Sequence, residues 1–173
     1  MDNSNITFQD LGLSDAMLKA LEKKGYGYPT TIQQQAIPEF LQWKDVIAKA
    51  PTGTGKTCAF GIPLIECLNP DMKDLQALVL CPTRELCIQI VEELRSLCAF
   101  KPWARIACIY GGQNINKQID YLKGGCHIVV ATPGRFMDHV NRRTLQIKNI
   151  TRVVLDEADE MLDMGFYKDV RRI

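Results

Sequence analysis

Five short apolar runs, each four to six residues long, recur along this chain of 173 residues. None of them alternates apolar with polar residues, as a strand with one face in water would do. Amphipathic segments with apolar residues at helical spacing lie between most of them. Strands buried on both faces and linked by helices are typical of a doubly wound, parallel α/β sheet. The predicted strands are residues 46–49, 77–81, 105–110, 128–131 and 152–155.

Helical patterns fill the intervals between these strands. The apolar spacing predicts helices over residues 57–68, 86–98 and 115–122. The first forty residues differ, because they contain no strand pattern. There Ser14 can cap a helix over 15–23 that ends at Gly25, and a second helix should run from Thr31 or Ile32 to Leu41. We therefore expect residues 1–41 to form a helical cap region packed on the sheet.

Composition excludes several classes of protein. The net charge is +1, so any nucleic-acid contact must come from local geometry and not from a basic tail. The apolar runs are too short to cross a bilayer, which predicts no membrane association. Seven cysteines occur without a Cys-x-x-Cys pair, and most lie in or beside apolar stretches. This pattern is typical of free thiols, and we expect a reduced, cytoplasmic protein.

A glycine-rich loop, Ala50-Pro-Thr-Gly-Thr-Gly-Lys-Thr57, follows the first predicted strand and precedes a predicted helix. Its two inner glycines can reach positive φ, which lets backbone N–H groups point at phosphate oxygens. The lysine would reach the β and γ phosphates, and the Thr57 hydroxyl would ligate Mg²⁺. A plain glycine-rich turn would need neither, although Ala50 replaces the first glycine of the usual pattern. The predicted nucleotide-binding residues of the loop are Thr52, Gly53, Thr54, Gly55, Lys56 and Thr57.

An acidic tetrad, Asp156-Glu157-Ala158-Asp159, follows the last predicted strand. Asp156 would lie at the carboxyl end of that strand, where α/β folds bind their ligands. We expect Asp156 to hold Mg²⁺ and Glu157 to polarise the attacking water. Acids after a strand can also simply cap the next helix, but the phosphate loop upstream favours the catalytic interpretation. The predicted catalytic residues are therefore Lys56, Asp156 and Glu157.

The tetrad, in its setting Val154–Phe166, resembles the signature of DEAD-box RNA helicases. Further segments are similar to motifs of that family, in the family's order. Gly25–Gln33 resembles the adenine-reading Q motif, and Phe8 stands at its upstream aromatic position. The three segments that hold single-stranded RNA in the family are matched by Pro82–Leu86, Gly111-Gly112 and Thr132–Arg135. The resemblance covers nearly the whole chain.

The resemblance implies that ATP is the nucleotide and that Mg²⁺ accompanies it. The Gln33 amide would pair with N6 and N7 of adenine, while Phe8 and Tyr26 would pack on the base or close that end of the pocket. Outside the family context, this glutamine would simply belong to a helix start. The resemblance also divides the chain into a Q-motif region, 1–41, and a partial RecA-like ATP-binding domain, 42–173.

RNA is the second implied partner, either single-stranded or as a duplex. Thr83 and Thr132 each precede a helical pattern and are good N-caps, which would leave backbone N–H groups for phosphates. Contacts to phosphates and 2′-hydroxyls would not depend on base sequence. The predicted RNA-binding residues are Pro82, Thr83, Arg84, Gly111, Gly112, Thr132, Pro133, Gly134 and Arg135.

The family's helicase core has two lobes, and this chain resembles only the first. The Ser-Ala-Thr motif expected soon after Arg172 is absent, and in the family its strand lies between the phosphate-loop strand and the Asp156 strand. We therefore expect an incomplete RecA-like sheet that lacks a central strand. The parent protein would couple ATP hydrolysis to RNA unwinding or to remodelling of RNA–protein complexes, whereas this piece alone should show little or no turnover. The alternatives are a non-catalytic ATP- and RNA-binding fragment and a P-loop ATPase of another class.

One departure from the family pattern bears on the backbone. Trp43 stands where the family usually has glycine before Lys-Asp-Val. We expect the turn at Trp43 to be built differently or to be strained.

Overall fold

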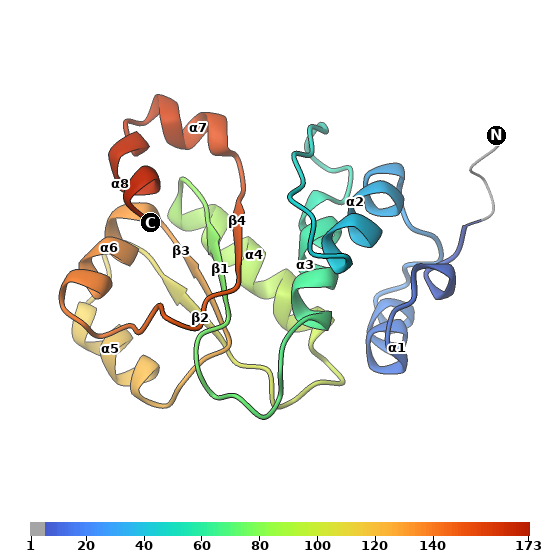
Figure 1. The fold of residues 1–173 in the computed structure, drawn as a ribbon, viewed down its shortest axis with the longest axis horizontal. Coiled ribbons are helices and arrows are strands. Elements are labelled where there is room, and N and C mark those ends of the chain that lie inside the picture. The colour runs from blue at the N-terminus through green and yellow to red at the C-terminus, as the bar shows by residue number, and fades with distance from the viewer. Residues whose placement is uncertain (1–5) are drawn as a thin grey trace. The chain divides into compact units, whose positions relative to one another are not determined.

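Figure 1 shows the computed structural model of the chain, which describes residues 6–173. The chain divides into two units. The first extends to Leu68 and includes Glu93–Pro102, and the second comprises Asn69–Glu92 and Trp103–Ile173. Helix α4 (Arg84–Leu97) contributes residues to both units.

The first unit is helical, as the sequence predicts for its N-terminal part. It contains η1 (Gln9–Leu11), α1 (Asp15–Lys23), α2 (Thr31–Leu41) and α3 (Lys56–Glu66). The Ser14 hydroxyl accepts the Met17 N–H at 3.3 Å and so caps α1, and Gly25 just beyond that helix has a φ of 75°. Both predicted N-terminal helices are therefore confirmed, and α2 packs along α3.

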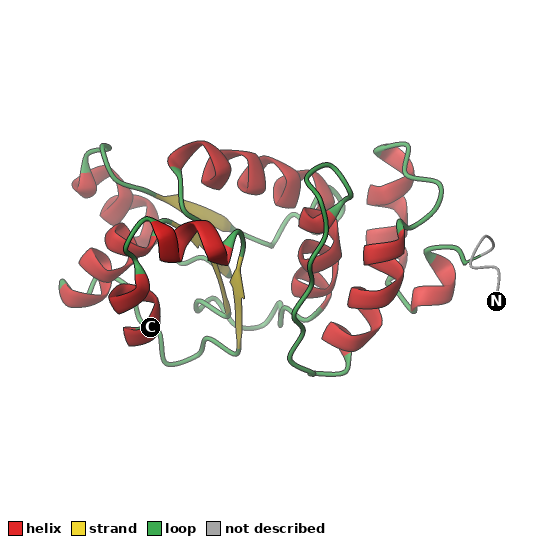
Figure 2. Cartoon of the chain, turned by 90° about the horizontal axis from the view of Figure 1, so that it is seen from above, coloured by secondary structure: helices red, strands yellow, loops and turns green. Residues whose placement is uncertain are grey.

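Residues 42–55 connect α2 to α3 as one long loop (Figure 2). The strand predicted over residues 46–49 is wrong for this structure, although the segment has the apolar composition of a strand. An isolated strand leaves its backbone N–H and C=O groups without partners, and no strand among the described residues pairs with this segment. Ile47 is fully exposed as a result, and Trp43 at the start of the loop has a φ of 64°.

The second unit contains a four-stranded parallel sheet, as predicted. Its strands are β1 (Ala77–Leu80), β2 (Ile106–Ile109), β3 (Ile128–Ala131) and β4 (Arg152–Leu155), in the order β2-β3-β1-β4. The last residues of the strands lie in register, since Leu80 pairs with both Ala131 and Leu155, and Ile109 pairs with Ala131. The inner strands β1 and β3 are wholly buried, which explains their continuous apolar sequences.

Helices surround this sheet. They are α5 (Ile115–Lys123), α6 (Pro133–Asn141), α7 (Ala158–Asp163) and α8 (Tyr167–Arg172). Phe136 of α6 and Met161 of α7 are buried in the same apolar cluster as Leu78, and α6 contacts α8. Among residues 6–173, no helix combines the length and the apolar character that crossing a bilayer requires.

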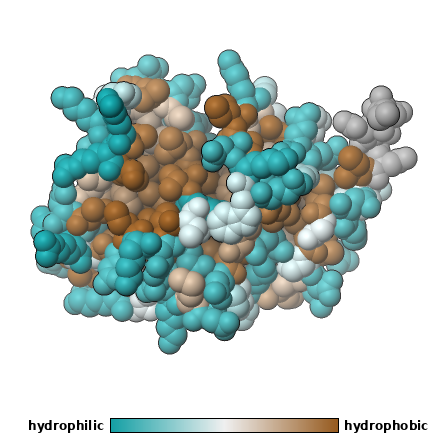
Figure 3. Space-filling view, viewed as in Figure 1, coloured by the Kyte–Doolittle hydropathy of each residue, from teal (hydrophilic) through white to brown (hydrophobic). Residues whose placement is uncertain are grey.

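Strand β4 forms an edge of the sheet, since within residues 6–173 it pairs only with β1. Two of its apolar side chains are exposed, Val153 by 52% and Leu155 by 43%. The space-filling view shows an apolar area over the sheet (Figure 3). Apolar side chains on the edge strand are what the sequence leads us to expect if a neighbouring strand is lacking.

Candidate functional site

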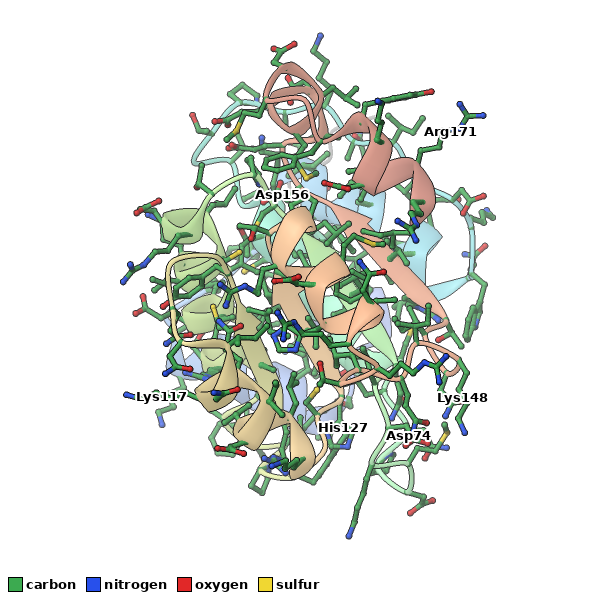
Figure 4. The ribbon with its side chains drawn as sticks, turned by 90° about the vertical axis from the view of Figure 1, so that its left-hand side faces the viewer. Asp74, Lys117, His127, Lys148, Asp156 and Arg171 are labelled. Carbon is green, nitrogen blue, oxygen red and sulfur yellow. The ribbon has the colours of Figure 1, made fainter. Side chains whose placement is uncertain are left out.

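The carboxyl ends of the four strands carry the candidate residues of the second unit. Thr83, Gly111, Thr132 and Asp156 all follow within a few residues of a strand end. Figure 4 shows Asp156 at one end of the sheet, with His127 and Asp74 at the other. Backbone bonds continue beyond the strands and hold this edge, because Thr132 N–H donates to Ile109 at 3.0 Å and Asp156 N–H donates to Leu80 at 2.9 Å.

Three predicted RNA-binding segments lie side by side along this edge. The Arg84 guanidinium in the first turn of α4 stacks 5.0 Å from the ring centre of Tyr110, the residue before Gly111. The Arg135 guanidinium in α6 donates to the main-chain oxygen of Gln113 at 2.9 Å, just after the Gly-Gly turn. The structure thus brings together segments that are up to fifty residues apart in the sequence.

The two threonines at this edge, Thr83 and Thr132, differ in whether their side chains cap the following helix. The Thr83 hydroxyl accepts the Leu86 N–H at 3.2 Å, which confirms the predicted cap of α4. Thr132 occupies the N-cap position of α6, but its side chain makes no capping bond. Pro133 is buried at the first position of that helix, where a missing N–H costs nothing.

The glycines of this edge have open space around them. A Cβ atom added at Gly111, Gly112 or Gly134 would meet no other atom of the chain within 4 Å. Gly112 has a φ of 80° and needs glycine for that reason, but Gly111 and Gly134 do not have positive φ. Packing within the chain therefore does not require glycine at these two positions, whereas close approach of an external ligand would.

The acidic tetrad begins where β4 ends and α7 starts. Glu157 has a φ of 52°, and left-handed backbone at a residue other than glycine is uncommon and concentrated at functional sites. The Glu160 carboxyl has a raised pKa, first because it hydrogen-bonds to Glu157 and then because burial and the charges of Glu157 and Asp159 oppose its ionisation. The tetrad and Glu160 thus place several carboxyl groups at the end of β4 and the start of α7.

The phosphate loop lies in the first unit and has the predicted backbone. Gly53 and Gly55 have φ values of 79° and 86°, and α3 begins directly afterwards at Lys56. The N-terminus of a helix combines free N–H groups with a positive dipole, so the loop suits an anion. A Cβ at Gly53 would meet nothing within 4 Å, which leaves its backbone open to a ligand.

Gln33 contacts the phosphate loop directly. Its side-chain oxygen accepts the Thr30 N–H at 3.0 Å, and its side-chain nitrogen donates to the Gly55 carbonyl at 3.1 Å. The Thr30 hydroxyl donates to the Thr54 carbonyl at 2.9 Å. A primary amide has two N–H groups and two carbonyl lone pairs, so one of each remains for another partner. The helix-start interpretation and a ligand-binding role are therefore compatible for this residue, whose side chain is buried.

Phe8 and Tyr26 line a common hollow of about 590 Å³ beside α1, together with Leu21 and Gly27. Phe8 is buried, whereas Tyr26 is exposed and its hydroxyl lies 3.4 Å from a Glu93 carboxylate oxygen. Neither Gln33 nor the phosphate loop is among the residues that line this hollow. The structure thus brings the two aromatic residues together without placing Gln33 in the same cavity.

The predicted Mg²⁺ ligands are few. Within residues 6–173, no three His, Cys, Asp or Glu side chains gather closely enough to hold a metal ion by themselves. The predicted ligands are only the Thr57 hydroxyl and the Asp156 carboxylate. Mg²⁺ commonly keeps several waters and takes one or two protein oxygens plus phosphate oxygens, so a hydroxyl and a carboxylate are donors of the kind that a nucleotide-bound Mg²⁺ takes.

Sequence reasoning missed three polar residues that support the predicted RNA-binding edge. They are Gln113, Gln118 and His139, and they are linked to Arg135 by hydrogen bonds. The sequence does single out Gln118. It stands three residues after Ile115 and four before Leu122, so helical spacing places it on the apolar face of α5. A polar residue on a buried helix face indicates a specific hydrogen-bonding partner.

A parallel α/β sheet with a glycine-rich phosphate loop and an acidic strand end defines the class of P-loop nucleotide-binding proteins. A family model described as "DEAD/DEAH box helicase" matches residues 30–173. The chain belongs to this DEAD/DEAH box helicase family, and its sheet has the RecA-like fold of that family.

Individual relatives agree with this assignment. The chain is 54% identical to the DEAD-box ATP-dependent RNA helicase CshA of Bacillus licheniformis, over 97% of this chain and 34% of the relative. It is 53% identical to CshA of Bacillus subtilis over the same shares. A crystal structure of a DEAD box protein from the hyperthermophile Methanococcus jannaschii superposes with a TM-score of 0.92 at 50% identity, and covers 97% of this chain and 46% of that one. The chain spans about a third of the length of these curated relatives.

Proposed function

We propose that this chain is the ATP- and RNA-binding lobe of an ATP-dependent RNA helicase. The whole protein would couple ATP hydrolysis to local unwinding of RNA duplexes or to remodelling of RNA–protein complexes. The observation that carries this proposal is the phosphate loop, in which two left-handed glycines lead directly into α3 at Lys56. Family membership and the identity to RNA helicases support it further. The free state of all seven cysteines is consistent with a cytoplasmic protein.

The roles of the nucleotide-binding residues follow from their chemistry. The N–H groups of Thr52 to Gly55 would bind phosphate oxygens, and Lys56 would neutralise charge on the β and γ phosphates. Bound Mg²⁺ would supply further neutralisation of that charge. The Thr57 hydroxyl and the Asp156 carboxylate are the oxygens that would hold it, and Glu157 would accept a proton from the attacking water.

Adenine recognition would fall to Gln33. One N–H and one lone pair of its amide are left after the bonds to Gly55 and Thr30, and adenine offers a matching acceptor and donor at N7 and N6. Guanine has a carbonyl where adenine has an amino group, so it would leave the lone pair unpaired. Phe8 and Tyr26 would pack on the base or close that end of the pocket, and in this structure they line a hollow that does not include Gln33.

RNA binding would use the carboxyl edge of the sheet. Arg84 and Arg135 supply positive charge there, and the open space beside Gly111 and Gly134 leaves room for an RNA backbone to approach closely. Contacts to phosphates and sugars position an RNA strand without reading its bases, so the binding would be independent of sequence. The ligand would be a single strand or one strand of a duplex.

Turnover would require the second helicase lobe of the whole protein. In related phosphoryl-transfer enzymes an arginine brought to the γ-phosphate contributes about 10³–10⁵ in rate. The 173-residue chain alone should therefore bind ligands but hydrolyse little ATP. RNA-stimulated hydrolysis by this chain at the rate of an intact helicase would contradict this part of the proposal.

Titration calorimetry of the chain with a non-hydrolysable ATP analogue and Mg²⁺ tests the nucleotide site. We expect Lys56→Ala to weaken binding by at least about tenfold, since a charge-assisted contact to phosphate is lost. Lys49→Ala, which changes an exposed lysine in the same loop, is the matched control and should leave the affinity unchanged. Equally tight binding of a GTP analogue would contradict the proposed adenine-reading role of Gln33.

A further inference from the structure

A buried glutamine links the elements that carry the RNA-binding edge. Gln118 of α5 is 4% exposed, and its amide makes four hydrogen bonds. Its nitrogen donates to the Tyr110 carbonyl at 3.1 Å and to the Gln113 side-chain oxygen at 2.8 Å. Its oxygen lies 3.0 Å from an Arg135 guanidinium nitrogen and 3.0 Å from Nε2 of His139. The hydrogen-bonding capacity of this amide is therefore filled.

These bonds determine that Nε2 of His139 carries a proton. The His139 side chain is wholly buried. Because both N–H groups of Gln118 point at acceptors, its oxygen must face Arg135 and His139. Nε2 of His139 must then donate to that oxygen, since an oxygen cannot donate in return. In the neutral ring Nδ1 is an acceptor, and it lies 2.8 Å from the Thr144 hydroxyl, whose one hydrogen also points at the His139 main-chain oxygen at 3.1 Å. Burial and the charge of Arg135 lower the pKa of His139, which agrees with a neutral ring.

The network holds the Gly-Gly turn through one residue, Gln113. The side-chain oxygen of Gln113 accepts from Gln118, and its main-chain oxygen accepts from Arg135 at 2.9 Å. Gln113 is itself exposed and directly follows Gly112, whose φ of 80° makes the turn. Two hydrogen bonds from a buried network thus fix an exposed turn that packing alone does not hold.

Arg135 is oriented by the same network. One of its terminal nitrogens donates to both Gln113 and Gln118, which leaves its other N–H groups for a ligand. A guanidinium anchored on one side presents its free side in a defined direction, so less entropy is lost when it binds a phosphate.

We propose that Gln118 and His139 are positioning residues for RNA binding, because they hold the Gly111-Gly112 turn and the Arg135 guanidinium in one arrangement at the carboxyl edge of the sheet. Neither residue touches the RNA in this proposal. The inference rests on the RNA-binding function proposed above, and it assigns to α5 and the interior of α6 a role in that function.

A second buried glutamine provides a matched control. Gln76 is 6% exposed, and its amide also makes several hydrogen bonds to a loop, with Asn69 and Met72. It precedes β1, at the amino end of the sheet. Gln118→Met and Gln76→Met remove the same chemical group from equally buried positions, so they should destabilise the chain to a similar degree.

The experiment compares these variants in the 173-residue chain by two measurements. Hydrogen exchange reports the order of residues 111–114, and fluorescence anisotropy with a labelled oligouridylate of about ten nucleotides reports RNA affinity. We expect Gln118→Met to speed exchange in the turn and to weaken RNA binding, each by at least about tenfold. Gln76→Met should do neither.

His139 provides an independent pair of variants should Gln118→Met fail to fold. His139→Gln keeps an N–H donor for Gln118 and should bind RNA within about threefold of the unmodified chain, whereas His139→Leu should resemble Gln118→Met. Equal loss of RNA affinity in Gln76→Met, or unchanged affinity in both Gln118→Met and His139→Leu, would overturn the inference. Absence of RNA binding by the unmodified chain would overturn the proposed function and this inference with it.

Discussion

The contact between Gln33 and Gly55 makes a quantitative prediction about the phosphate loop. A Cβ atom added at Gly55 would lie 2.4 Å from the side-chain nitrogen of Gln33 and 3.3 Å from the Thr30 hydroxyl. Gly55→Ala must therefore displace the Gln33 amide and break its bond to the Gly55 carbonyl. Gly53→Ala is the matched control, because Gly53 has a similar φ of 79° but no atom of the chain near its Cβ position.

Both substitutions incur the cost of left-handed backbone, but only Gly55→Ala also displaces a hydrogen bond. Left-handed backbone costs a residue other than glycine about 1–2 kcal/mol, which applies to both positions. The displaced hydrogen bond adds about 0.5–1.5 kcal/mol at Gly55 alone. We therefore expect the free energy of unfolding to fall by about 1.5–3.5 kcal/mol in Gly55→Ala and by about 1–2 kcal/mol in Gly53→Ala.

Urea denaturation followed by circular dichroism measures both values. The difference of about 1 kcal/mol should largely disappear when Gln33 is first changed to alanine, because the amide that the added Cβ would displace is then absent. Equal destabilisation by Gly55→Ala and Gly53→Ala in the unmodified background would refute the direct contact between the Q motif and the phosphate loop.

Three further predictions concern single residues. Trp43→Gly should stabilise the chain by up to about 1 kcal/mol in urea denaturation. Trp43 is exposed and has left-handed backbone (φ 64°), which glycine adopts without steric cost. A loss of stability would contradict this prediction. Gly134→Ala should raise helix stability by about 0.5–1 kcal/mol, and yet weaken oligouridylate binding in an anisotropy titration; unchanged RNA affinity would argue against close approach of RNA at this position. Acidification below the ordinary histidine pKa of 6.5 should destabilise the chain, because burial lowers the pKa values of His127 and His139 and the unfolded chain then binds more protons. In urea denaturation at several pH values, His139→Gln should lose less stability on acidification than the unmodified chain, and an equal loss would show that His139 does not contribute.

Much of the fold follows from local sequence pattern. Mainly apolar runs marked all four strands of the sheet. The inner strands β1 and β3 are wholly buried and so have no polar positions, whereas β4 is an edge strand with exposed apolar side chains. The run at 46–49 has the same pattern and yet is a loop, since a strand also needs a neighbour to pair with. The composition of a segment indicates whether it can be buried, but it does not indicate whether a neighbouring strand is there to pair with it. The unusual backbone at Trp43 was foreseeable only from the family's preference for glycine there.

The candidate site was predictable where function depends on short motifs. The phosphate loop, the acidic tetrad and the Thr83 cap are local features. The structure shows left-handed glycines in the loop, places Asp156 directly after β4, and forms the Thr83 cap. The capping bond expected of Thr132 is absent, and the proline at the first helical position does not account for this, since a cap bonds to the N–H groups that follow that position. The network around Gln118 joins α5, α6 and the Gly-Gly turn, and no local pattern in the sequence relates these segments to one another.

An amide NMR titration of the chain tests the central claim most directly, since it locates each ligand by residue. Addition of an ATP analogue with Mg²⁺ should shift the amide signals of Thr52–Thr57, of Gln33 and of Asp156–Glu157. Subsequent addition of oligouridylate should shift those of Thr83–Arg84, Gly111–Gly112 and Thr132–Arg135. An absence of shifts in Thr52–Thr57 on addition of the nucleotide, or RNA-induced shifts confined to other parts of the chain, would contradict the assignment of this chain as the ATP- and RNA-binding lobe of a helicase.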